Sequence, residues 1–170
     1  MLKVETAAFD AVAPWLTEAR WIASGHPDSV GERGPMDRVQ RAAFHASRRL
    51  GRRPVRAGGF VAHCFRVADP DLVLPEAPEP PAAWLDWGGD CAPQIGAVAI
   101  LCAGRSDAPA HVGFYLAEDG DAFHVLGGPR ADAVSIGRHP KERLLGFRWP
   151  AGHRQTGQRL TAPPSHADPA

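Results

Sequence analysis

Apolar positions in the first third of the chain recur with a helical period. From Ala7 to Ser24 they return every three or four residues, which predicts an amphipathic helix. A second helix is predicted from Pro35 to Leu50, with its arginines mostly off the apolar stripe. A third, more buried helix is predicted from about Ala57 to Ala68. The segment Pro75–Pro81 contains four prolines in seven residues and is therefore expected to be an extended loop.

The pattern after this loop is typical of strands. Apolar runs are short and separated by Gly, Asp and Pro, and Glu118-Asp119-Gly120-Asp121 has the composition of a hairpin turn. Helices followed by an antiparallel sheet predict an α+β fold. At 170 residues the chain is long enough for one domain, expected over 1–150, and the polar segment 151–170 is expected to be a disordered tail. The predicted strands are Ala97–Cys102, His111–Ala117, Ala122–Leu126 and Leu144–Trp149.

Composition narrows the possible partners and compartments. The formal net charge is zero and the pI is about 7.1, which gives no electrostatic reason to expect nucleic acid or a membrane surface as a partner. No apolar run approaches the roughly 20 residues of a membrane span, and the N-terminus does not resemble a secretory signal. We expect a cytoplasmic protein, unless a phage or secretion machine exports it without a cleaved signal.

Charge is nevertheless unevenly distributed. Eight arginines lie between Val30 and Arg56 against two acids, whereas six acids lie between Arg66 and Ala92 against one arginine. The simplest interpretation is two solvated faces that attract each other or a partner weakly.

His111 is the clearest candidate for chemistry. It opens the apolar stretch His111-Val112-Gly113-Phe114-Tyr115, a setting suited to a general base. Such a base serves a thiol or hydroxyl nucleophile, commonly at the start of a helix far upstream. The predicted helix start Arg56-Ala57-Gly58-Gly59-Phe60-Val61 contains neither. The base is therefore present without an evident nucleophile.

Several sequence blocks resemble a family of small bacterial and phage cell-wall hydrolases in the papain-like NlpC/CHAP superfamily of cysteine amidases and endopeptidases. The resemblance is close over Trp84–Pro150, weaker over Pro14–Cys64 and absent in the tail. It implies a papain-like fold, with N-terminal helices packed on a C-terminal antiparallel sheet. The blocks are 60–64, 84–88, 111–115, 125–128, 133–136, 140–141 and 143–148.

The same resemblance implies where the catalytic residues would lie. Anchored on Phe60-Val61, the cysteine nucleophile of the family falls on Ala57 and the preceding tryptophan on Arg56, while His111 keeps the position of the base. The polar residue that orients the histidine falls on Pro129, which has no side-chain donor or acceptor. Two of the three catalytic positions are thus vacant. This predicts a pseudoenzyme that binds a peptidoglycan fragment or a protein partner, with Arg56, Trp84 and Trp87 as binding residues.

Two alternatives remain open. An active peptidoglycan hydrolase would need a displaced thiol, and Cys91 is the cysteine expected to be most exposed, whereas Cys64 and Cys102 have apolar neighbours. An interaction module would instead work through the basic helix Pro35–Leu50. The three cysteines form no CxxC pair, so we expect neither a disulfide framework nor a zinc site. His63 and His124 could approach His111, but without metal-ligand spacing we expect no metal and no cofactor.

Overall fold

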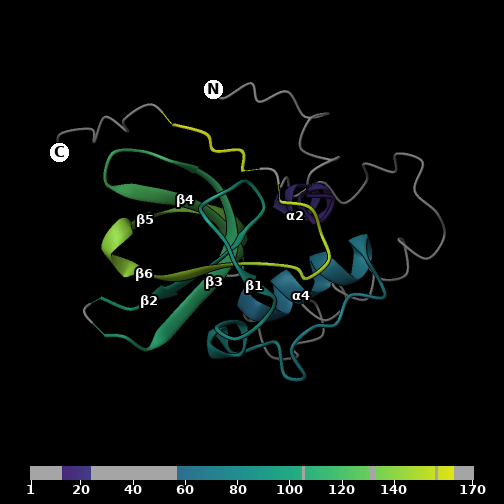
Figure 1. Ribbon diagram of the computed structural model, residues 1–170. Helices are drawn as coiled ribbons and strands as arrows, with labels where there is room; N and C mark the ends of the chain where they lie inside the picture. The colour runs from purple at the N-terminus through teal and green to yellow at the C-terminus, as the bar shows by residue number, and fades with distance from the viewer. Residues whose placement is uncertain (1–12, 24–56, 105, 131–132, 156, 163–170) are drawn as a thin grey trace.

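The computed structural model describes residues 13–23, 57–104, 106–130, 133–155 and 157–162. Over these ranges it contains two α-helices, α2 (Trp15–Ala23) and α4 (Ala57–Ala68), and a six-stranded antiparallel sheet. Figure 1 shows both helices on the same side of the sheet. The predicted α+β class is therefore confirmed, as a six-stranded antiparallel sheet with two helices. Within these ranges no helix is both long and apolar enough to cross a membrane.

The sheet order is β1-β6-β2-β3-β4-β5. The β3–β4 hairpin turns at the predicted Glu118–Asp121 segment, and β6 lies between β1 and β2. β5 was not predicted, and it forms the outer strand beside β4. The strands are β1 (Gly89–Asp90), β2 (Val98–Cys102), β3 (Pro109–Glu118), β4 (Ala122–Arg130), β5 (Ala133–Pro140) and β6 (Leu144–Trp149).

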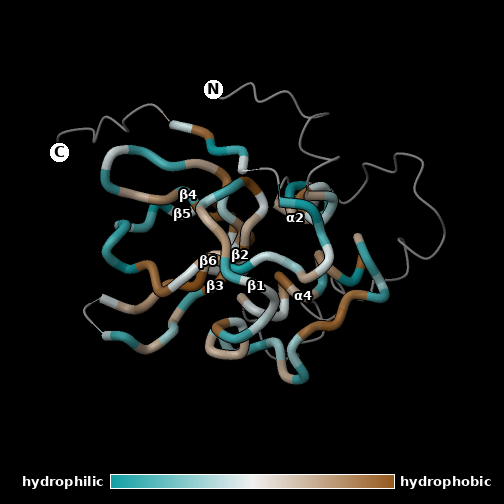
Figure 2. The backbone as a smooth tube through the Cα atoms, in the orientation of Figure 1, coloured by the Kyte–Doolittle hydropathy of each residue, from teal (hydrophilic) through white to brown (hydrophobic). Residues whose placement is uncertain are grey.

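The core lies on both faces of the sheet. On one face, Phe114 of β3 packs edge-on against Phe60 and Phe65 of α4, with ring centroids 6.1 and 5.5 Å apart. On the other face the adjacent residue Tyr115 packs against Phe147 at 5.6 Å, because successive residues of a strand point to opposite sides. Figure 2 shows hydrophobic segments converging where the sheet meets α4, and mostly hydrophilic outer loops.

The predicted helices and tail have different outcomes. α4 spans the predicted residues Ala57–Ala68, and α2 lies inside the predicted Ala7–Ser24. The predicted helix Pro35–Leu50 lies outside the described residues. The disordered tail expected over 151–170 remains a prediction, but within it Gln158, Leu160 and Ala162 form backbone hydrogen bonds with Ile95 and Glu118.

Candidate functional site

The three predicted catalytic segments meet beside two consecutive glycines of β4. A Cβ atom built on Gly127 would lie 2.5 Å from Nε2 of His111, and one built on Gly128 would lie 3.0 Å from Cα of Ala57. The first distance is shorter than real Cβ contacts and the second is tighter than nine in ten of them, so a side chain at either position would require a neighbour to move. His111 at the start of β3 and Ala57 at the start of α4 therefore both contact the Gly127–Gly128 backbone. We call this region the open end of the β3–β4 hairpin.

Position 57 has the local environment that a nucleophile would need. Ala57 is the first residue of α4 and is partly exposed. The first backbone N–H groups of a helix carry partial positive charge and stabilise an anion such as a thiolate. The methyl group of Ala57 carries no charge, so the partial positive charge of these N–H groups does not stabilise it. The next two residues, Gly58 and Gly59, have no side chain that could act as a nucleophile in place of Ala57.

The Nε2–Cε1 edge of His111 lies against Gly127, two residues before Pro129. An orienting side chain at position 129 would thus come from the backbone segment that this edge of the imidazole already contacts. Position 129 is a proline, which can neither donate nor accept a side-chain hydrogen bond. The assignment of His111, Ala57 and Pro129 to catalytic positions remains a prediction.

The predicted binding role of Trp84 and Trp87 needs correction. Trp84 is fully buried and donates its indole N–H to the carbonyl of Pro78 at 2.9 Å. Trp87 is 8% exposed and donates to the carbonyl of Val73 at 2.8 Å. Both indoles pack against Phe65 of α4. They hold the proline-rich loop against the helix, so neither ring is placed to contact a ligand. Arg56, the third predicted binding residue, lies outside the described residues.

The displaced-thiol alternative is not supported by the position of Cys91. This residue follows β1, and its N–H donates to the carbonyl of Phe147 in β6. Three strand spacings separate β1 from the strand of His111, which amounts to about 14 Å at the usual spacing of neighbouring strands. Burial also raises the pKa of the Cys91 thiol, with Asp90 adding to the effect against a hydrogen bond from Gln94. Cys91 is therefore neither activated nor near His111.

The other two cysteines are buried. Burial raises the pKa of the Cys64 thiol well above its usual value, and the negative charge of Glu18 raises it further. Cys64 is fully enclosed in the core, as its apolar neighbours predicted. Cys102 is 8% exposed at the end of β2. These positions are those of small apolar residues rather than nucleophiles.

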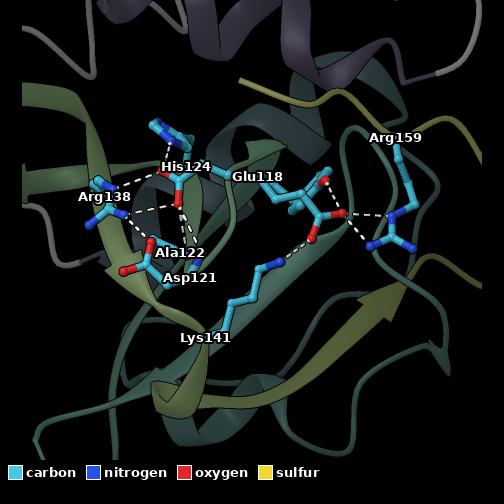
Figure 3. Close-up of polar contacts among 9 residues, drawn as sticks. Glu118, Asp121, Ala122, His124, Arg138, Lys141 and Arg159 are labelled. Carbon is cyan, nitrogen blue, oxygen red and sulfur yellow. Dashed lines mark hydrogen bonds and ion pairs between the residues drawn. The ribbon is translucent and has the colours of Figure 1, made fainter. Parts of the chain in front are cut away.

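The opposite end of the hairpin carries a polar network that the sequence did not reveal. Asp119 accepts hydrogen bonds from the N–H groups of Asp121 and Ala122, pairs with His124 at 2.8 Å, and accepts two bonds from Arg138 (Figure 3). The hydrogen bonds from Arg138 are the main reason that the pKa of Asp119 lies far below its usual range. We call this region the turn end.

Glu118 completes the turn end. Its carboxylate contacts Lys141 at 2.7 Å and also pairs with Arg159, and Tyr115 donates its hydroxyl to it at 3.2 Å (Figure 3). Burial alone would raise the pKa of Glu118, but the hydrogen bonds and charges of Lys141 and Arg159 lower it overall. Burial, together with Glu118, raises the pKa of Tyr115 to about 12.

Two histidines considered for a metal cluster have carboxylate partners instead. His63 of α4 lies 3.3 Å from Glu18 of α2, and His124 pairs with Asp119. Within the described ranges, no group of three or more His, Cys, Asp or Glu side chains is arranged to hold a metal ion.

A histidine that was not among the predicted site residues has its ring against His111. The ring of His139 in β5 stacks on His111, with centroids 5.1 Å apart and planes 22° apart. The signal that could have found it is the alternation of Ser135, Gly137 and His139 along an unrecognised strand. Gly137 and Pro140 are unfavourable residues in a strand, so the segment did not resemble one.

Comparison with known proteins gives limited information. The sequence matches no family model, and it matches no curated protein. A solved structure similar to this chain is that of a lipoprotein-like protein of the NLP/P60 family from Staphylococcus aureus. The two sequences are 16% identical, the TM-score is 0.45, and the match covers 88% of this chain and 43% of that chain. This chain thus spans less than half the length of that protein.

Proposed function

We propose that this protein is a non-catalytic member of the papain-like cell-wall hydrolases that binds a peptidoglycan stem peptide or a protein partner. The observation that supports the proposal is that His111 and Ala57, the first residue of α4, approach adjacent residues of β4, Gly127 and Gly128. A cysteine hydrolase requires a thiol as well as a base, and here α4 begins with a methyl group where the resemblance expects the thiol.

The chemistry explains why binding is the better expectation than cleavage. Covalent hydrolysis by this class needs a thiolate to attack the carbonyl and an imidazole to move the proton. Ala57 has no lone pair and no acidic proton. The pKa values of the Cys64 and Cys91 thiols are raised, and β1, which precedes Cys91, lies three strand positions from the strand of His111. The partly exposed side chain of His111 can still contact a peptide.

Purified protein incubated with peptidoglycan sacculi tests this proposal directly. We expect mass spectrometry of the soluble muropeptides to show no new products, and co-sedimentation to show binding to the sacculi. His111→Ala is the matched variant, because it alters the predicted base and leaves the two glycines in place. Cleavage that disappears in His111→Ala would show that the protein is an active hydrolase and would overturn the proposal.

Binding needs its own control. A variant carrying Arg143→Ala removes a positive charge from the 3-10 helix Lys141–Arg143 and changes none of the predicted site residues, and we expect it to bind sacculi as the unmodified protein does. Loss of binding in His111→Ala but not in Arg143→Ala would support the open end as the binding site. Equal binding by all three proteins would place the interaction elsewhere.

A further inference from the structure

Two imidazoles from strands that are not neighbours meet at the open end. β4 lies between β3 and β5 in the sheet, so the two strands that carry His111 and His139 are two strand spacings apart, about 10 Å. The residues are also offset along the strands, because His139 pairs with Phe123 near the turn and His111 precedes Gly113, which pairs with Gly127. Their rings nevertheless stack, with centroids 5.1 Å apart and an interplanar angle of 22°. Side chains that far apart can meet only if they lean toward each other over the intervening strand.

Glycines provide the space for this approach. A Cβ on Gly127 would come within 2.5 Å of Nε2 of His111, and a Cβ on Gly137 would come within 2.6 Å of Nε2 of His139. Gly127 pairs with Ser135 and Val125 pairs with Gly137, which places the two glycines diagonally on one face of the β4–β5 ladder. Both rings therefore occupy volume that ordinary side chains at 127 and 137 would fill.

The two histidines differ in exposure. His139 is only 7% exposed, whereas His111 is partly exposed. Burying an imidazole costs desolvation energy unless its surroundings compensate, and both residues make further interactions besides the stack. The buried ring is suited to holding its neighbour, and the exposed ring is the one that a ligand can reach.

We propose that His139 is a positioning residue, which fixes the ring orientation of His111 by stacking against it from β5. It would thereby take over, by ring contact, the orienting task that a proline at position 129 cannot perform by hydrogen bonding. The inference rests on the proposed function, in which His111 faces the ligand. Because ring orientation determines which imidazole nitrogen is presented, His139 would set how His111 meets a ligand.

Nuclear magnetic resonance of the histidine side chains tests this without any ligand. Long-range proton–nitrogen correlation spectra report the tautomer and environment of each ring. We expect His139→Leu, which keeps side-chain volume but removes the aromatic face, to shift and broaden the ring signals of His111. His139→Phe restores an aromatic face, and we expect it to return the His111 signals toward those of the unmodified protein.

The control is His153→Leu, because the ring of His153 packs against Trp15 rather than against His111. Circular dichroism establishes that each variant is folded. Unchanged His111 ring signals in folded His139→Leu would overturn the inference, as would changes of equal size in His153→Leu. Should His139→Leu fail to fold, Gly137→Ala serves instead, since its Cβ would displace the His139 ring directly.

Binding of a purified disaccharide-tetrapeptide separates this inference from the proposed function. Absence of binding to the unmodified protein, with His111 still disturbed in His139→Leu, would remove the proposed function and leave the positioning role standing. Equal binding by the unmodified protein and His139→Leu, with identical His111 signals, would remove the positioning role alone. We expect binding to weaken several-fold in His139→Leu and to recover in His139→Phe.

Discussion

The β3–β4 hairpin has two ends with different chemistry. At the turn end, Glu118 and Asp119 each pair with cationic side chains, and Asp119 also accepts hydrogen bonds from two backbone N–H groups. At the open end, His111 lies over a glycine and against another imidazole. Satisfied buried ion pairs fix a conformation and offer little to a ligand. The contrast separates polar groups that hold the fold from polar groups that a ligand can reach.

The largest expected effect comes from closing the space at the start of α4. A Cβ on Gly58 would lie 1.9 Å from the carbonyl oxygen of Pro78 and 2.9 Å from Nε1 of Trp84. Gly58→Ala would push the loop away and break the buried indole hydrogen bond. Overpacking and an unpaired N–H together outweigh the gain in helix propensity, so we expect a loss of about 3 kcal/mol in unfolding free energy.

Gly146→Ala is the matched control for this variant, because nothing lies within 4 Å of a Cβ built there. Urea denaturation followed by circular dichroism measures both. Equal stability of the two variants would mean that the loop at Pro78 yields easily, and that the open end is less tightly enclosed than the contacts indicate.

A shortened chain ending at residue 156 removes a structural support of the turn end. The segment 157–162 forms backbone hydrogen bonds with Ile95 and Glu118, and Gly157 donates to the side chain of Gln94 at 2.9 Å. Each of these hydrogen bonds contributes roughly 1 kcal/mol, and water replaces part of that contribution in the shortened chain. We therefore expect the free energy of unfolding to fall by about 2 kcal/mol. Thermal unfolding measures it, and an unchanged midpoint would contradict the described packing.

Low pH should reduce the contribution of the turn end to the stability of the fold. The folded-state pKa values of Asp119 and Glu118 are lowered, so their contribution to stability is present above the unfolded-state values near about 4 and is lost as pH falls from there through the folded values. We expect stability to decline below about pH 4. In Glu118→Gln this decline should be shallower, and denaturant titrations at pH 2 to 6 compare the two proteins.

Gly127→Ala should affect the open end with little effect on the fold. The new methyl group would displace the edge of His111, which is a movable ring rather than backbone. We expect a stability change below about 1 kcal/mol and weaker binding to sacculi. Retained binding, with an unchanged His111 spectrum, would show that the ring moves aside without consequence.

The smallest effect is expected from restoring a thiol. Ala57→Cys alone should give little or no peptidoglycan hydrolysis, because a proline at 129 cannot hold a protonated imidazole through a hydrogen bond, and stacking on His139 does not replace that bond. Adding Pro129→Asn should give more. Muropeptide release by each variant is compared with that of the unmodified protein. Full activity from the single change would mean that the third residue has been assigned to the wrong position.

The elements that were predicted correctly are those with a recognisable pattern within their own residues. The helix Ala57–Ala68 and the strand Leu144–Trp149 have the predicted bounds, because continuous apolar runs flanked by Gly and Pro leave few alternatives. β5 was missed since Gly137 and Pro140 weaken a strand pattern. The packing of residues 157–162 was also missed, because long-range backbone pairing leaves no periodicity in a polar segment.

The site was only partly predictable for the same reason. The positions of His111 and Ala57 came from resemblance, and the structure brings both to the Gly127–Gly128 backbone. The stack with His139 depends on the order of β3, β4 and β5 in the sheet, which sequence spacing does not specify. The role expected for Trp84 failed because an aromatic residue in a loop can equally be buried by that loop.

The aromatic core has an optical consequence. Trp84 and Trp87 lie with ring centroids 4.9 Å apart, and Trp15 and Trp149 lie 5.1 Å apart. Indoles this close couple their electronic transitions, so near-ultraviolet circular dichroism should carry a strong signal from the junction between helices and sheet. Any event that separates α2 or the proline-rich loop from that junction would change the spectrum, which gives the protein a built-in reporter without an added label.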